Sequence, residues 1–155
     1  MPRISNSAPF GSLRLAKEYL AAATKIQPPA TSEIDALRQR ISFPAYFLVG
    51  HSIELSLKAF LLGRGMKISA LRSRSFGHDL GALISEARRR RIGLQVKLSA
   101  KELKGIMVLN DCYAAKEFEY AVTGLRHLPP YQLVHATATR LNETLQSYCL
   151  ELASP

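Results

Sequence analysis

The chain has 155 residues, of which 47% are hydrophobic, so it holds enough apolar material for the core of one domain. This composition excludes a chain that is disordered over most of its length. Its formal net charge of +9, from 21 Lys and Arg against 12 Asp and Glu, favours acidic partners such as nucleic acid or an anionic membrane surface. A soluble protein that is merely basic is the alternative interpretation.

The two cysteines, Cys112 and Cys149, have no metal-like spacing with a neighbouring Cys or His. We therefore expect buried free thiols in a reducing compartment. The sequence indicates neither a metal site nor a cofactor.

The longest apolar stretch, residues 43–62, is interrupted by charged and polar side chains, so no transmembrane helix is expected. The apolar part of the N-terminal region contains Lys17 and Glu18, which a signal peptide would lack. We expect a cytoplasmic chain that does not associate with a membrane.

The first half of the chain predicts two long helical segments. Residues 1–11 lack periodicity and are expected to form a flexible tail. A helix begins near Ser12, because apolar residues then recur at helical spacing up to Pro28-Pro29. A second helical pattern starts near Glu33 and reaches about Leu62, and Pro44 inside it predicts a kink or a break.

The second half predicts three further helices. After a connection over residues 66–77, Asp79 can cap a helix that runs to about Arg91, with Gly93 as its stop. Ser99 and Glu102 form a capping-box pattern that opens the next helix.

Residues 114–129 are ambiguous, and a last helix follows Pro129-Pro130 and runs to about Leu152. The sequence has no alternating strand pattern of useful length and no internal repeat. We therefore expect an all-α fold, an up-and-down bundle of about five helices over residues 12–153.

Three segments carry motifs in a characteristic order. The segment 51–63 contains Glu54-Leu-x-Leu-Lys58-Ala and ends in a glycine, the segment 77–84 opens with Gly-His-Asp-Leu, and the segment 109–120 contains Leu109-Asn110, Tyr113 and Phe118-Glu119-Tyr120. Together they resemble the HEPN superfamily, in its central helix, in the start of its next helix, and in its late helix with the turn beyond it. The resemblance extends over roughly residues 12–150.

This resemblance implies a helical bundle that is often a dimer. Many HEPN proteins act as ribonucleases in toxin–antitoxin, phage-defence and RNA-processing systems. Others act beside a nucleotidyltransferase partner, and some are inactive binding modules. The resemblance therefore implies a homodimer that binds RNA or a nucleotide, with a nucleotidyltransferase or an antitoxin as a possible protein partner.

Active HEPN ribonucleases carry an arginine and a histidine, four to six residues apart, at the start of a late helix. A histidine can transfer the proton and an arginine can stabilise the phosphate charge, so no metal is needed. Here Arg126 and His127 are adjacent, and His135 lies too far from Arg126. Arg72 and His78 have an allowed spacing but precede a different helix. His78, Arg72 and His135 are thus weak candidates for a relocated catalytic site.

His51, Glu54 and Lys58 lie on one face of the predicted central helix. In one interpretation Glu54 and Lys58 pair with each other, and His51 is a core or interface histidine. In the other, the three form a polar stripe that lines a cleft for phosphate or a nucleotide.

His78 and Asp79 allow a similar choice. Asp79 caps a helix while His78 packs near its start, or His78 contacts a phosphate beside that helix N-terminus. Asn110 and Tyr113 can join either polar site, because spacing alone does not place them.

The run Arg88-Arg89-Arg90-Arg91 lies near the end of a predicted helix, where cations are favourable and are usually solvated. The alternative is a contact surface for RNA or DNA phosphates. Few aromatic residues are close to the run in sequence, so such binding would depend on the nucleic-acid backbone and be sensitive to salt.

Three functions remain open from the sequence. The first is a non-catalytic homodimer that binds RNA or a nucleotide. The second is a metal-independent endoribonuclease with a non-standard Arg/His site. The third is a structural helical bundle that binds another protein through an exposed apolar strip.

Overall fold

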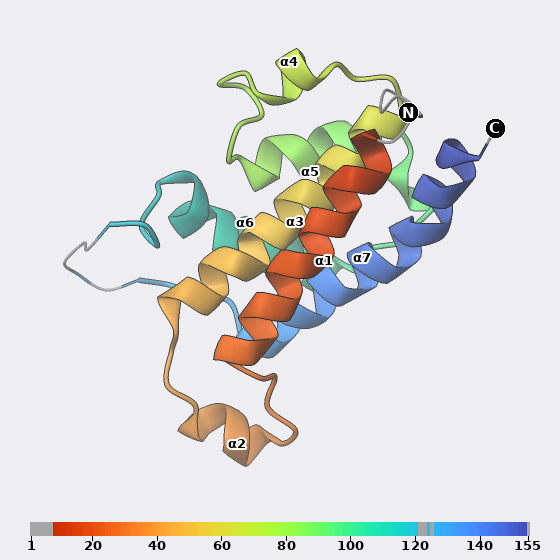
Figure 1. Cartoon of the computed structure of the whole chain (residues 1–155). Helices are drawn as coiled ribbons and strands as arrows, with labels where there is room; N and C mark the ends of the chain where they lie inside the picture. Colours follow the sequence, from red (N-terminus) through yellow and green to blue (C-terminus); the bar gives the residue numbers. More distant parts are fainter. Residues whose placement is uncertain (1–7, 121–123, 125, 155) are drawn as a thin grey trace.

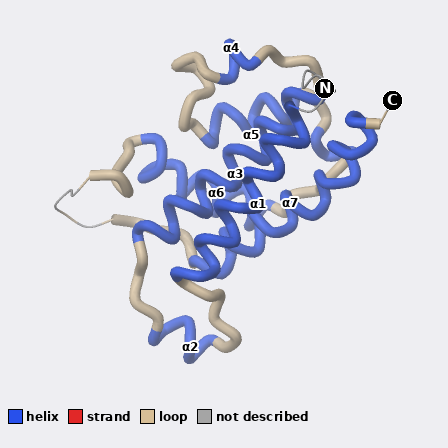
Figure 2. The backbone as a smooth tube through the Cα atoms, viewed as in Figure 1, coloured by secondary structure: helices blue, strands red, loops and turns tan. Residues whose placement is uncertain are grey.

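This computed structural model describes residues 8–120, 124 and 126–154, which form helices joined by loops. Over these residues there are seven α-helices, one 3₁₀ helix and no β-strand. The all-α prediction is therefore confirmed (Figure 2). The α-helices are α1 (Ala8–Ile26), α2 (Glu33–Arg38), α3 (Phe43–Gly63), α4 (Ile68–Leu71), α5 (Leu80–Arg89), α6 (Ala100–Ala114) and α7 (Tyr131–Ala153), and η2 (Ile92–Leu94) is the 3₁₀ helix.

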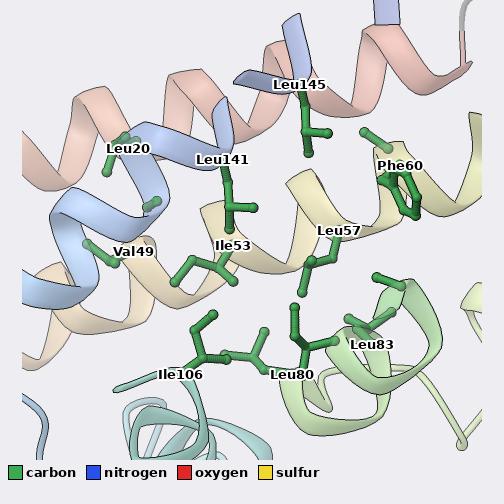
Figure 3. Close-up of a cluster of buried hydrophobic side chains, with 14 of the residues drawn as sticks. Leu20, Val49, Ile53, Leu57, Phe60, Leu80, Leu83, Ile106, Leu141 and Leu145 are labelled. Carbon is green, nitrogen blue, oxygen red and sulfur yellow. The ribbon is translucent and has the colours of Figure 1, made fainter. Parts of the chain in front are cut away.

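The central element of the fold is α3. Helices α1 and α7 pack against one side of it and against each other, while α5 and α6 pack on the other side (Figures 1 and 3). The two short helices, α2 and α4, lie at opposite ends of the bundle (Figure 1). The five long helices match the number expected from the sequence.

The core is built from apolar side chains that α3 presents on most of its sides. Such a helix must be covered all around, because each buried aliphatic side chain contributes roughly 1.5–3 kcal/mol relative to its exposed state. Figure 3 shows residues of α1, α5, α6 and α7 converging on it. The fully buried members include Ile53, Leu57, Phe60, Leu80, Leu83, Ile106, Leu141 and Leu145. Both cysteines are also buried and unpaired, as expected.

The helix directions depart from a simple up-and-down order. Hydrogen bonds from Ser12 to Leu55 and from Ser52 to Ala16 show that α1 and α3 are antiparallel. Helix α5 is parallel to α3, since its beginning lies near Glu54 and its end lies near Arg64. The long connection that contains α4 brings the chain back along α3 and so interrupts the alternation (Figure 1).

The first helix begins earlier than the sequence predicts. Helix α1 starts at Ala8 instead of Ser12, so residues 8–11 belong to the helix and not to a flexible tail. Pro9 lies in the first turn, where a missing N–H costs no hydrogen bond, and it is buried. Residues 1–7 of the expected tail lie outside the described part of the chain.

Pro44 marks a break between two helices. Helix α2 ends at Arg38, and α3 begins at Phe43 with Pro44 in its first turn, a position that tolerates proline. The Ser42 hydroxyl caps α3 by accepting a hydrogen bond from the Ala45 N–H at 3.3 Å. The helical pattern predicted from Glu33 to Leu62 is thus two helices, and the interruption expected at Pro44 is a break that lies just before it.

Other predicted helix boundaries agree closely with the structure. Asp79 caps α5, and Ser99 with Glu102 forms the capping box of α6. Helix α5 ends at Arg89, and the left-handed residue after it is Arg91, at φ 67°, instead of the predicted stop Gly93. Within the ambiguous stretch 114–129, residues 121–123 and 125 lie outside the described residues.

One described helix, α3, is long and apolar enough to cross a membrane by length and composition. However, 67% of its apolar window is buried inside the bundle, as in the core helix of a soluble protein. The expectation of a cytoplasmic chain stays a prediction.

A buried polar contact joins α1, α3 and α7 in the core. The Ser56 hydroxyl donates to Asn142 Oδ1 at 2.6 Å, and the Asn142 amide donates to the Ser52 hydroxyl at 3.3 Å. The Ser52 hydroxyl in turn donates to the Ala16 carbonyl at 2.7 Å. This network fixes how the three helices align, because a shift would leave buried polar atoms without partners.

Replacing Asn142 with Ala should lower the free energy of unfolding by about 1–3 kcal/mol, since two buried serine hydroxyls lose a partner. Urea denaturation followed by far-UV circular dichroism measures this change. The control is Glu143→Ala at the exposed neighbouring position, which should change stability by no more than about 0.5 kcal/mol. Equal stabilities of the two variants would show that the network contributes nothing.

Candidate functional site

A buried carboxylate lies at the centre of the polar face of α3. Glu54 is 1% exposed, and the Lys58 ammonium donates to its Oε1 atom at 2.6 Å. The predicted pairing of Glu54 with Lys58 is therefore present. His51, one turn earlier, lies with its Nδ1 atom 3.4 Å from Glu54 Oε2. The three side chains share one face of the helix, as their spacing of three and four residues predicts.

His78 reaches the same carboxylate from the connection before α5. Its Nδ1 atom lies 3.1 Å from Glu54 Oε2, and its side chain is 45% exposed. The backbone of His78 is left-handed, at φ 57°. A residue with a side chain adopts this conformation at a cost of about 1–3 kcal/mol, so the surrounding structure must hold it there.

Tyr113 completes the group from α6. Its hydroxyl donates a short hydrogen bond to Glu54 Oε2 and lies 3.0 Å from His51 Nδ1. The Tyr113 ring can approach α3 this closely because Gly50 has no side chain: a Cβ atom there would lie 2.7 Å from Tyr113 Cδ2. We call His51, Glu54, Lys58, His78 and Tyr113 the Glu54 cluster.

The Glu54 cluster keeps its carboxylate ionised. Burial by itself would raise the pKa of Glu54, but hydrogen bonds with His51, Lys58 and Tyr113 outweigh burial and hold that pKa well below its usual range. Burial and the nearby Glu54 charge raise the pKa of Tyr113 far above its usual value, so its hydroxyl is the donor. The cluster is thus one negative charge surrounded by donors and one ammonium.

Asn110 lies beside the cluster but serves the start of α5. Its Oδ1 atom accepts from the Leu80 N–H at 2.8 Å, and its amide donates to Asp79 Oδ1 at 3.0 Å. The same Asp79 oxygen accepts from the Ala82 N–H at 3.0 Å and caps the helix. Asn110 and Asp79 therefore satisfy backbone donors that the first turn of α5 leaves free.

The arginine run divides into two pairs. Arg89 and Arg90 both donate to the Glu86 carboxylate, and these hydrogen bonds lower the pKa of Glu86 to about 2. Arg88 and Arg91 are exposed, and neither forms an ion pair with any carboxylate among the described residues. Two of the four arginines of the run therefore share one carboxylate within the chain.

Arg88 and Arg91 line a surface hollow of about 640 Å³ at the end of α5. Lys97 contributes a third cation, and η2 and the start of α6 supply the remaining wall. We call it the basic hollow, and its lining is Arg88, Arg91, Ile92, Gly93, Leu94, Val96, Lys97, Leu98 and Leu103.

The Glu54 cluster and the basic hollow lie at opposite ends of α5. Because a ten-residue helix is roughly 15 Å long, the sequence-predicted binding residues do not form one site. His51, Glu54, Lys58 and Tyr113 belong to the cluster, together with the catalytic candidate His78, whereas Arg88 and Arg91 belong to the hollow.

The three catalytic candidates are not brought together. His135 is 9% exposed between α1 and α7, where its Nε2 atom lies 2.7 Å from the Thr24 hydroxyl. Arg72 is exposed at the end of α4, and no hydrogen bond or ion pair joins its side chain to His78 within the described part of the chain. Of the three, His78 is the one that contacts the buried Glu54 carboxylate.

The sequence did not reveal the link between His78 and Glu54. The two residues are 24 positions apart, and only packing of the turn before α5 against α3 brings them together. The pairing of Glu86 with Arg89 and Arg90, by contrast, follows the helical spacing of three and four residues and was readable from the sequence.

Comparisons of the chain with models of known protein families, with curated proteins and with solved structures found no match.

Replacing Gly50 with Ala should destabilise the chain by about 1–3 kcal/mol, because the new methyl group collides with the buried Tyr113 ring. The control is Gly11→Ala in α1, where no atom of the described residues lies within 4 Å of the new Cβ. Helix propensity alone should stabilise this control by up to about 1 kcal/mol. Urea denaturation compares the two, and a change of the same sign in both would refute the close contact at Gly50.

Burial of His135 makes stability depend on pH. Burial lowers the pKa of His135 in the folded chain, whereas the unfolded chain titrates near pH 6.5. The unfolded state therefore binds the proton more readily. The contribution of neutral, buried His135 to the free energy of unfolding is complete above about pH 6.5. It is lost as the pH falls, by at most about 1.4 kcal/mol per pH unit.

His135→Gln keeps a polar partner for Thr24 but does not titrate. Between about pH 7 and about pH 5, the unmodified chain should lose more stability than this variant, measured by urea denaturation at each pH. If the free energies of unfolding of the unmodified chain and the variant change with pH in parallel, His135 has no role in acid sensitivity.

Proposed function

We propose that this chain is a HEPN-type helical module that forms a homodimer and binds the phosphates of RNA or of a nucleotide. Two features support the family assignment. One is the order and spacing of the three sequence segments that resemble HEPN proteins. The other is the arrangement of the segment 51–63 as a central helix with Lys58 and Glu54 on one face.

The basic hollow is the observation that carries the proposed binding. Arg88 and Arg91 face it without a carboxylate partner, while the adjacent Arg89 and Arg90 are held by Glu86. Lys97 lines the same hollow. Three cations around one concave surface, on a chain of net charge +9, favour a ligand that carries several phosphates.

The side chains that line the hollow also indicate how nucleic-acid bases would contact it. Ile92, Leu94 and Val96 give it an apolar part, and Leu94 is 71% exposed. None of the described residues that line it is aromatic. Bases would therefore rest against aliphatic groups without stacking on rings, and the affinity would come mainly from the phosphate backbone.

Arg88→Gln should weaken RNA binding, whereas Arg89→Gln, which removes the same charge one residue away, should change it much less. The reason is that Arg88 lines the hollow and Arg89 already pairs with Glu86. Fluorescence anisotropy with a labelled single-stranded RNA pool at several salt concentrations measures both. Loss of one phosphate contact should reduce the salt slope by about 0.7.

Two results would overturn this proposal. One is a chain that binds neither RNA nor nucleotides at low salt and sediments as a 17.2 kDa monomer. The other is equal weakening by the two substitutions, because binding would then depend on overall charge. Co-purification with a stoichiometric protein, such as a nucleotidyltransferase or an antitoxin, and no RNA binding would favour the structural bundle.

A metal-independent ribonuclease is the second candidate function. The favouring observation is that His78 is partly exposed and held by the ionised Glu54 carboxylate, as a general acid or base would be. Incubation of the purified chain with a labelled RNA pool, without divalent metal, detects cleavage. His78→Ala should then abolish cleavage with helicity unchanged, and cleavage that persists in this variant would exclude His78 as the catalytic group.

A further inference from the structure

We propose that His51, Glu54 and His78 form a binding site for a divalent transition-metal ion, with Zn²⁺ as the ion that fits best. Each of the three side chains offers one donor atom, and these three atoms all lie within 4.8 Å of one another. Glu54 Oε2 lies within 3.4 Å of the Nδ1 atom of each imidazole. This site departs from the expectation, drawn from sequence spacing, that the chain holds no metal. It is independent of the proposed phosphate binding in the basic hollow.

The distances between the donor atoms fit a tetrahedral ion. Zinc lies about 2.0–2.2 Å from nitrogen and oxygen ligands, so two ligands of one tetrahedral ion are about 3.3 Å apart. Glu54 Oε2 lies 3.1 Å from His78 Nδ1 and 3.4 Å from His51 Nδ1. Both carboxylate–imidazole separations are thus already those of two ligands on one ion.

The three ligands are held by separate structural features. His51 and Glu54 come from consecutive turns of α3, the most buried helix of the bundle. The His51 ring stacks on Phe47 and meets the edge of Tyr19, which fixes its plane. His78 has a left-handed backbone conformation and directly precedes Asp79, the cap of α5. A rigid site of this kind has its ligands in place before the ion binds.

Lys58 and Tyr113 contact the proposed ligands from outside. The Lys58 ammonium bonds Glu54 Oε1 at 2.6 Å, so Oε2 contacts only the two imidazoles and the Tyr113 hydroxyl among the interactions of the described residues. The Tyr113 hydroxyl also lies 3.0 Å from His51 Nδ1, whose one lone pair would pass to the ion, and the hydroxyl would keep its hydrogen bond to the carboxylate as an outer-sphere partner. Hydrogen bonds from such partners orient metal-binding side chains and are part of most metal sites.

The ligand set selects among ions. Two imidazoles and one carboxylate suit zinc and related transition metals, whereas magnesium and calcium prefer oxygen ligands only. Three protein ligands leave the fourth tetrahedral position open. His78, with its side chain 45% exposed, places that position at the surface of the molecule. Because Lys58 already offsets the Glu54 charge, the loaded site is cationic, and water or an anionic oxygen would fill the open position.

The experiment titrates the full-length purified chain with Zn²⁺ alone by isothermal calorimetry, after treatment with a chelator. The expected result is one ion per chain with a dissociation constant in the micromolar range or below. His78→Asn keeps a residue type that tolerates a left-handed backbone, and His51→Gln keeps a polar group beside Tyr113. Each should weaken binding by about 100-fold or more, because even the loss of an outer-sphere partner costs about 10–100-fold.

The matched control is His127→Asn, which removes an exposed histidine outside the cluster and should leave binding unchanged. Absence of stoichiometric zinc binding overturns the proposal. Equal binding by His78→Asn, His51→Gln and the control also overturns it, since the ion would then lie elsewhere.

A second measurement needs no variant. Zinc-edge X-ray absorption of the loaded, unmodified chain should show imidazole and oxygen ligands at about 2.0–2.2 Å. A sulfur ligand at about 2.3 Å would place the ion on Cys112 or Cys149 and would overturn the site.

Discussion

The buried charge of Glu54 is the constraint on which the packing of α3, α6 and the turn before α5 depends. An isolated carboxylate inside a protein is very costly, so the fold must surround it with donors. Lys58 comes from the same helix, His78 from the turn before α5, and Tyr113 from α6. One carboxylate thus ties three parts of the chain together, and removal of any one partner leaves the others around an incompletely compensated charge.

Helix α5 connects the two polar regions of the molecule and keeps them apart. Its beginning supports His78 beside Glu54, and its end carries Arg88 and Arg91 to the basic hollow. Leu80, Leu83 and Ile84 on its buried face hold the helix on the core. A change that moves α5 along α3 would therefore affect both regions together, although they share no side chain.

The sequence could predict the features that depend on residues close together along the chain. The caps at Asp79 and Ser99 follow from hydrogen bonds within one helical turn, and the Glu54–Lys58 pair follows from helical spacing. The contact between His78 and Glu54 depends on how two segments pack, and no local pattern encodes it. The earlier start of α1 was missed for a similar reason, because Pro9 is held in the helix by burial.

Asn110 lies outside the Glu54 cluster and fixes the helix start that directly follows His78. Its side chain holds Asp79 and the Leu80 N–H, which fixes the first turn of α5. His78 immediately precedes that turn in a left-handed conformation that is unfavourable by itself. Because the capped helix start sets the backbone of Asp79, it also limits where the imidazole of His78 can point. The polar residue that sequence spacing could not place therefore supports the position of His78, and its effect on Glu54 is transmitted through the backbone.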